Sequence, residues 1–125
     1  MALDILIVDD SAAIRKILQR VLVQAEVAVG KVHEAADGEE ALIKLEEGGG
    51  KVGLIFSDIN MPKMDGIELL GRVRAQAAYR EVPFIVITTE GSQQRVLQAI
   101  ELGANGYVRK PFTPEQIKEK LVGLV

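Results

Sequence analysis

Cysteine and tryptophan are absent from this chain of 125 residues, and histidine occurs only once. Without cysteine, the protein can form neither disulfides nor thiolate metal sites. No uninterrupted apolar stretch is long enough to span a bilayer. No basic region precedes an apolar run at the N-terminus, so we expect neither membrane insertion nor a secretory signal. These absences leave a cytoplasmic protein as the expectation.

The balance of charge excludes a further class of partner. The chain has 15 Lys and Arg residues and 18 Asp and Glu residues, which gives a net charge of −3. A chain with this charge is not expected to bind nucleic acid directly. Hydrophobic residues make up 48% of the sequence, which is ordinary for a globular fold. We therefore expect residues 1–125 to form a single domain that buries roughly two-thirds of its unfolded surface.

Short apolar runs alternate with segments of helical periodicity at intervals of about 20–25 residues. The expected strands cover residues 5–8, 29–35, 54–58, 84–87 and 106–108. The first helix is expected to bury Ile14, Ile17, Leu18, Val21 and Leu22, and the fourth, from about Ser92 to Leu102, to bury Val96, Ala99 and Ile100. This alternation predicts an α/β fold of the three-layer, doubly wound (βα)5 flavodoxin-like type, with a five-stranded parallel sheet in the order 2-1-3-4-5.

Local signals mark several helix ends. Asp37 is an expected N-cap, and Asp65-Gly66 is expected to be a cap and turn before the third helix. Thr113, with Pro and Gln after it, predicts a capping box at the start of the last helix. The run Gly48-Gly49-Gly50 ends the second helix and is expected to be a flexible connector.

Polar side chains follow the apolar runs at the ends of four predicted strands. Asp9 and Asp10 come after the first strand, Asp58 ends the third, Thr88 closes the fourth, and Lys110 follows the fifth. The carboxyl ends of the strands in an open parallel sheet face one ligand crevice. We therefore expect three carboxylates, one hydroxyl and one ammonium to meet there.

Carboxylates packed this closely repel one another unless a cation lies between them. Mg²⁺ prefers oxygen ligands in an octahedron, and no His or Cys lies nearby in the sequence to make a zinc site. Asp10 and Asp58 are expected as direct ligands, and Asp9 as a ligand directly or through water. The backbone carbonyl of Asn60, on the loop after Asp58, is a further candidate.

A carboxylate beside a metal ion, a hydroxyl and an ammonium suits phosphoryl transfer. Asp58 is the expected nucleophile, because its strand is central and has a partner strand on each side. Lys110 and the metal would neutralise charge on the phosphoryl oxygens, with Thr88 beside them. The product would be an aspartyl phosphate, which adds a charge of about −2.

These residues resemble the motifs of response-regulator receiver domains of the single-domain chemotaxis type, over the whole chain. The matching pieces are Asp9-Asp10, Asp58-Ile59-Asn60-Met61-Pro62, Asp65-Gly66, Thr88, Tyr107 and Lys110-Pro111. The resemblance implies that Asp58 accepts a phosphoryl group from a sensor histidine kinase or from small donors such as acetyl phosphate. It implies Mg²⁺ held by Asp9, Asp10, Asp58 and the Asn60 carbonyl, with Thr88 and Lys110 on the phosphoryl oxygens. Such a domain is a signalling module that catalyses only its own phosphorylation and dephosphorylation.

The resemblance also implies a switch. Thr88 would move toward the phosphate and Tyr107 would turn inward, so that the face of the fourth helix, fifth strand and fifth helix changes its affinity for partners. The partner would be a protein such as a flagellar motor switch or a phosphotransfer protein, and the chain is expected to be monomeric. A cis Lys110-Pro111 bond is expected as well.

Three alternatives remain open at this point. The chain could be a phosphate sink, a relay or a receiver module of another two-component pathway. It could be an aspartate-nucleophile phosphatase, although the position two residues after the nucleophile, where a proton donor is usual, holds Asn60. It could also bind a nucleotide or flavin, although the turn after the first strand has no glycine to cradle phosphate.

One residue departs from the commonest pattern of the resembling family. Thr89 follows the switch threonine, where a small residue is usual, and its β-branched side chain is expected to hinder attacking water. Asn60 and Glu90 flank the same mouth and match the chemotaxis-type pattern, which favours faster loss of phosphate.

Overall fold

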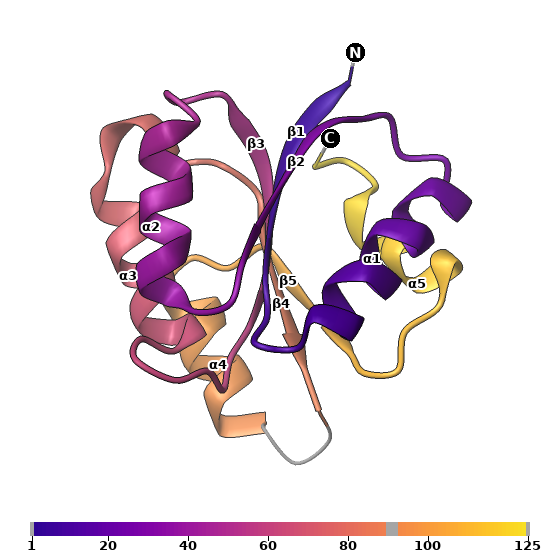
Figure 1. The fold of residues 1–125 in the computed structure, drawn as a ribbon. Coiled ribbons are helices and arrows are strands. Elements are labelled where there is room, and N and C mark those ends of the chain that lie inside the picture. The colour runs from indigo at the N-terminus through magenta and orange to yellow at the C-terminus, as the bar shows by residue number, and fades with distance from the viewer. Residues whose placement is uncertain (1, 90–92, 125) are drawn as a thin grey trace.

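The computed structural model describes residues 2–89 and 93–124. In chain order its elements are β1 (Leu3–Val8), α1 (Ala12–Gln24), β2 (Val29–Ala35), α2 (Gly38–Glu47), β3 (Val52–Asp58), α3 (Gly66–Ala75), η1 (Ala77–Tyr79), β4 (Phe84–Thr88), α4 (Gln93–Glu101), β5 (Gly106–Arg109) and α5 (Pro114–Leu121). All neighbouring strands pair in parallel, in the order β2-β1-β3-β4-β5. Helices α1 and α5 cover one face of the sheet, and α2, α3 and α4 cover the other (Figure 1). The predicted fold and strand order are confirmed.

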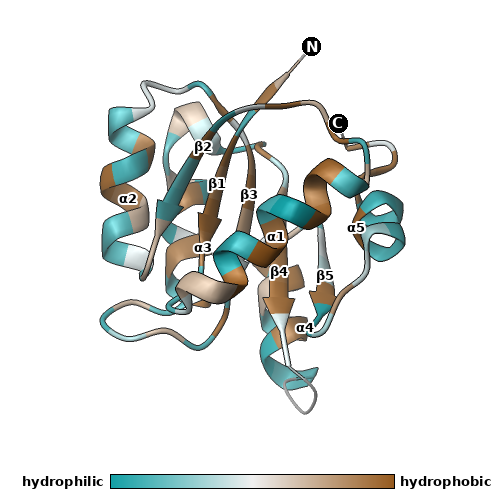
Figure 2. Ribbon diagram, turned by 45° about the vertical axis from the view of Figure 1, so that its right-hand side comes forward, coloured by the Kyte–Doolittle hydropathy of each residue, from teal (hydrophilic) through white to brown (hydrophobic). Residues whose placement is uncertain are grey.

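Alternation along the strands divides the buried side chains between two cores. In β1, Ile5 and Ile7 pack on the α1 and α5 side, while Leu6 and Val8 pack on the α2 and α3 side. Successive side chains of a strand point to opposite faces, so a continuously apolar strand supplies both cores at once. Figure 2 shows the central strands β1, β3 and β4 in the brown of apolar residues, whereas the edge strand β2 is largely teal and the helices carry both colours.

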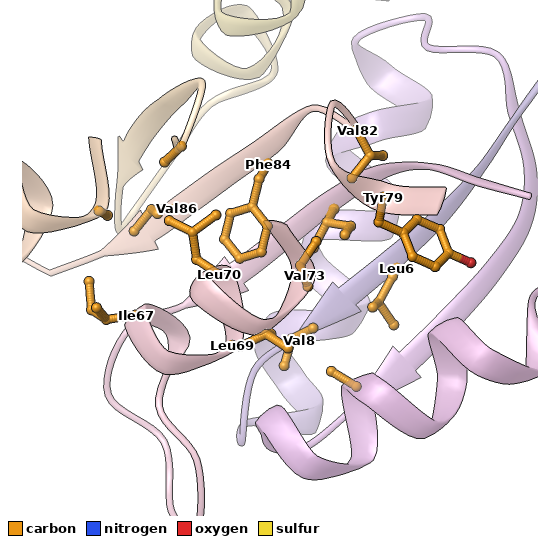
Figure 3. Packing of buried hydrophobic residues seen from close by; sticks show 14 of the residues in the cluster. Leu6, Val8, Ile67, Leu69, Leu70, Val73, Tyr79, Val82, Phe84 and Val86 are labelled. Carbon is orange, nitrogen blue, oxygen red and sulfur yellow. The ribbon is translucent and has the colours of Figure 1, made fainter. Parts of the chain in front are cut away.

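The larger core lies between the sheet and α3. Leu70 and Val73 of α3 surround the ring of Phe84 from β4, and all three side chains are fully buried (Figure 3). Burial of a large apolar side chain contributes about 1.5–3 kcal/mol, so this packing holds α3 firmly against β4. The tip of β3, which carries Asp58, is fixed in the same unit because β3 pairs with β4.

Two predicted helix faces were partly wrong. Ile17 of α1 is 43% exposed and Ile100 of α4 is 42% exposed, although Leu18, Val21 and Leu22 are buried, as are Val96 and Ala99. Each helix packs on the sheet through a narrow stripe, and residues at its flank remain in water. Ser92, the expected start of the fourth helix, lies outside the described residues. Strands β1 and β3 also begin two residues earlier than predicted.

Side-chain caps mark the starts of α1, α2, α3 and α5. Asp37, Asp65 and Thr113 accept hydrogen bonds from the backbone N–H three residues on, as predicted, and Thr113 is part of a full capping box. Ser11 caps α1 in the same way. In the glycine connector, the Gly50 N–H donates to the Tyr79 hydroxyl at 2.9 Å, so that turn is held at one point. Short, capped connections keep the strand tips in defined positions.

Candidate functional site: an acidic pocket at the carboxyl ends of the strands

Three carboxylates meet where β1 and β3 end side by side. Val8 pairs with Ser57, so Asp9 and Asp58 are neighbouring continuations of the two strands. Each of Asp9, Asp10 and Asp58 places a carboxylate oxygen within 4.8 Å of the other two. Asp9 and Asp58 are buried, while Asp10 is exposed at the mouth. The structure thus brings together the three acids that the sequence singled out.

Lys110 reaches this cluster from the end of β5. Its N–H donates to the carbonyl of Thr88 at 2.7 Å, which fixes the residue beside β4. Its ammonium nitrogen lies 2.8 Å from Oδ2 of Asp9 and 3.3 Å from Oδ2 of Asp58. The Lys110–Pro111 bond is cis, as expected.

In each buried acid, one carboxylate oxygen accepts a hydrogen bond from a nearby backbone N–H and the other oxygen faces the pocket. Oδ1 of Asp9 accepts from the Ser11 N–H at 2.9 Å, and Oδ1 of Asp58 accepts from the Ile59 N–H at 2.8 Å. Both Oδ2 atoms face the Lys110 ammonium. The two side chains are therefore held in fixed orientations, each with one oxygen available for a ligand.

The electrostatics of the pocket favour an added cation. Burial, the largest cause, raises the pKa of Asp58, and repulsion from Asp9 adds to it against the opposing attraction of Lys110. Burial lowers the pKa of Lys110, but its contacts with Asp9 and Asp58 outweigh burial and leave that pKa raised. One ammonium can balance only one of three carboxylates. A cluster of carboxylate oxygens with an excess of negative charge fits a hard divalent cation such as Mg²⁺.

Thr88 ends β4, and Tyr107 lies on the neighbouring strand β5. The Thr88 side chain is buried, and its hydroxyl donates to the Thr89 carbonyl at 3.2 Å. Tyr107 is 40% exposed, with the ammonium of Lys120 5.2 Å from its ring centre. Both residues line a hollow of about 300 Å³ against α4, together with Thr89. Asn60 is exposed on the loop two residues after Asp58.

Sequence reasoning missed Arg15, whose guanidinium contacts the backbone, and not the carboxylates, of the acidic pocket. It lies on α1 and donates to the backbone carbonyl of Asp9. A basic residue within the first turns after an acidic strand end was the available signal. That signal is weak, because most such residues project into solvent.

Fold and pocket together define a flavodoxin-like α/β domain with an acidic cation site at the switch point of its sheet. The family described as the response regulator receiver domain matches residues 5–122, and the chain belongs to this family. Receiver domains are signalling domains that bind Mg²⁺ through an acidic pocket, and the cluster of Asp9, Asp10 and Asp58 is such a pocket.

Within the family, the chain is closely related to the CheY chemotaxis response regulators. It is 41% identical over 117 residues to chemotaxis protein CheY1 of Helicobacter pylori, covering 94% of this chain and 92% of that protein. It is 42% identical over 120 residues to a CheY homologue of Campylobacter jejuni, covering 94% and 88%. The solved structure of Vibrio cholerae CheY4 is 36% identical, with a TM-score of 0.86 and full coverage of both chains.

A solved structure of a liganded complex is also similar to this chain. It is a CheX–CheY–BeF3–Mg²⁺ complex from Borrelia burgdorferi, 30% identical, with a TM-score of 0.85, covering 96% of this chain and 87% of that one. Every helix of the described residues is too short or too polar to cross a membrane.

Proposed function

We propose that Asp58 accepts a phosphoryl group from a sensor histidine kinase in the presence of Mg²⁺, as part of a two-component phosphorelay. The observation that carries the proposal is the position of the Lys110 ammonium between two carboxylates. It lies 3.3 Å from Oδ2 of Asp58 and 2.8 Å from Oδ2 of Asp9. A nucleophilic oxygen, a fixed cation and an acidic cluster therefore share one small pocket.

Asp9, Asp10, Asp58 and the backbone carbonyl of Asn60 would hold the Mg²⁺. When bound, the metal supplies positive charge against the phosphoryl oxygens and the crowded carboxylates. Asp58 Oδ2 attacks phosphorus, the new P–O bond forms, and the P–N bond to the donor imidazole breaks, with the bonding pair leaving on that nitrogen. Lys110 remains protonated and binds a phosphoryl oxygen, and the Thr88 hydroxyl donates to another.

The output would pass through the surface formed by α4, β5 and α5. Thr88 and Tyr107 line the same hollow against α4, so movement of one changes the space open to the other. Leu97 and Ile100 of α4 are 64% and 42% exposed, which offers an apolar surface to a protein target. Given the chemotaxis relatives, the target would be of the flagellar motor switch or phosphotransfer type, with the chain acting as a cytoplasmic monomer.

Mass spectrometry of the chain incubated with acetyl phosphate and Mg²⁺ tests the phosphoacceptor role. The native chain is expected to gain one phosphoryl group, and Asp58→Asn is expected to gain none. No addition to the native chain, or equal addition to the variant, would refute the proposal. Omission of Mg²⁺ is expected to abolish addition to the native chain.

Capture of target proteins with and without a beryllofluoride mimic of the phosphoryl group tests the output. A protein target retained only in the presence of the mimic, and lost on Leu97→Ala, would support the proposed surface. Rapid phosphoryl exchange between the chain and a histidine phosphotransfer protein, with no target retained, would instead favour a phosphate sink or relay.

A further inference from the structure

Arg15 joins the acidic pocket to the neighbouring strand without entering the pocket. Its Nη1 donates to the carbonyl oxygen of Asp9 at 2.6 Å, and its Nε donates to Oε1 of Glu34 at 2.9 Å. The Arg15 side chain is only 17% exposed, whereas that of Glu34 is 40% exposed. The Arg15 side chain is thus largely buried, and it bridges the end of β1 at Asp9 and the end of β2 at Glu34.

Three of the four polar atoms of Asp9 are held by hydrogen bonds with the backbone or with Arg15, and the fourth, Oδ2, faces the Lys110 ammonium in the pocket. Its N–H donates to the Ala35 carbonyl at 3.0 Å, its Oδ1 accepts from Ser11, and its carbonyl accepts from Arg15. Glu34, which holds Arg15, directly precedes Ala35 on β2. The end of β2 therefore orients both sides of the Asp9 backbone.

Asp10 depends on this arrangement more than Asp9 does. Its carboxylate is exposed and makes no hydrogen bond or ion pair within residues 2–89 and 93–124. What orients it is the peptide group that joins it to Asp9, and the oxygen of that group is the atom to which Arg15 donates. A rotation of this peptide group would swing the Asp10 carboxylate away from Asp9 and Asp58.

We propose that Arg15, held by Glu34, is a positioning residue of the acidic pocket, which orients the Asp9–Asp10 peptide group and thereby places the Asp10 carboxylate for Mg²⁺. The inference rests on the proposed function, because it concerns the same pocket. A residue can orient a metal ligand without contacting the metal itself. Substitution of such a residue typically changes metal affinity by about 10–100-fold.

Two alternative roles for Arg15 predict different results. If its charge were all that mattered, removal of the guanidinium would relieve repulsion of the incoming cation and tighten binding of any divalent ion. If the residue only tied α1 to β2, its loss would lower the stability of the fold and leave cation affinity unchanged in folded protein. A positioning role predicts weaker binding, and a greater loss for Mg²⁺ than for Ca²⁺, because Mg²⁺ demands near-ideal octahedral geometry whereas Ca²⁺ tolerates irregular sites.

The test is titration of the full chain with Mg²⁺ and with Ca²⁺ by calorimetry, at a temperature where urea unfolding shows every variant to be folded. Arg15→Ala is expected to raise the Kd for Mg²⁺ about 10-fold and to raise that for Ca²⁺ less. Arg15→Lys keeps the charge but has no fork to span both acceptors, so it too is expected to bind Mg²⁺ more weakly. Arg72→Ala is the matched control, since it removes an exposed arginine paired with Glu68 on α3, and its Kd values are expected to equal those of the native chain.

Glu34→Gln provides a second variant that preserves the fold. It removes the charge of Glu34 while keeping an acceptor for Arg15, and it is expected to bind Mg²⁺ nearly as well as the native chain. Equal or tighter Mg²⁺ binding by Arg15→Ala, or an equal loss for both ions, would overturn the positioning role while leaving the phosphoacceptor proposal intact. If the native chain bound no Mg²⁺ and gained no phosphoryl group, both proposals would fail together.

Discussion

Gly66 lies so close to the backbone of Asp58 that a Cβ atom on it would overlap the Asp58 carbonyl oxygen. The Gly66 N–H also donates to the Ile59 carbonyl at 2.8 Å. The first residue of α3 is thus packed directly on the chain that carries the proposed phosphoacceptor. Absence of a side chain at this position allows the helix to start beside the pocket.

Gly66→Ala is therefore expected to destabilise the fold by about 1–3 kcal/mol, because either α3 or the end of β3 must move. Gly71, in the same helix, has no atom within 4 Å of a built Cβ. Gly71→Ala is the matched control and is expected to stabilise the chain by up to about 1 kcal/mol through helix propensity. Urea unfolding followed by circular dichroism measures both, and equal stability of the two variants would contradict the close contact.

Asp58→Asn is expected to stabilise the chain at neutral pH without Mg²⁺, by on the order of 1 kcal/mol, because it removes a buried carboxylate repelled by Asp9 while Lys110 keeps its contact with Asp9. Burial, with repulsion from Asp9, raises the pKa of Asp58 above its unfolded value of 3.8, so the folded protein binds that proton more tightly than the unfolded chain does. This contribution to stability is present below pH 3.8 and is lost as the pH rises through the folded-state pKa.

The gap in the free energy of unfolding between Asp58→Asn and the native chain should accordingly open as the pH rises from below 3.8. Added Mg²⁺ should close it, because metal binding stabilises the native chain more than the variant. Urea unfolding at acidic and neutral pH, with and without Mg²⁺, measures these differences. A variant less stable than the native chain at neutral pH in the absence of Mg²⁺ would run against the prediction.

Arg74 connects the end of α3 to three other parts of the fold. Its guanidinium donates to the carbonyls of Tyr79, Val82 and Gly103 at 2.7–3.2 Å. Arg74→Ala would leave these acceptors to water or unpaired and is expected to cost about 2 kcal/mol. Arg74→Lys should recover little, because an ammonium has no planar fork.

Arg72→Ala, two residues away, removes an exposed ion pair with Glu68. It is expected to change the free energy of unfolding by less than about 0.5 kcal/mol. Similar losses for Arg72→Ala and Arg74→Ala in the same unfolding experiment would argue against a specific role for the Arg74 contacts.

Thr89→Ala is expected to shorten the lifetime of the phosphorylated chain several-fold. Thr89 is exposed beside the buried Thr88, and we expect its β-branched side chain to restrict the approach of water to the pocket mouth. Decay of radiolabelled phosphoprotein, measured after removal of the donor, reports the rate. Thr89→Ser, which keeps the hydroxyl but removes the methyl group, distinguishes bulk from polarity: it should resemble Thr89→Ala, and equal decay for all three chains would dispose of the idea.

The alternation of strands and helices was predictable because it follows from the local spacing of apolar residues along the chain. The runs around Ile7, Phe56 and Ile85 are apolar at every position, which is typical of strands covered on both faces. Caps such as Asp37 and Thr113 depend on residues three positions apart, so they too were predictable. Exposure of Ile17 and Ile100 was not, because it depends on how much of each helix the sheet covers.

The sequence by itself determined the alternation of strands and helices and the residue types that end each strand, and crossover handedness left few alternative strand orders. It thereby specified that acids and a lysine would converge. Only the tertiary structure decided which oxygens face Lys110, that Gly66 must lie on Asp58, and that Arg15 braces the Asp9 carbonyl. These relationships join residues on different elements at ångström precision, and close packing, rather than local pattern, sets them.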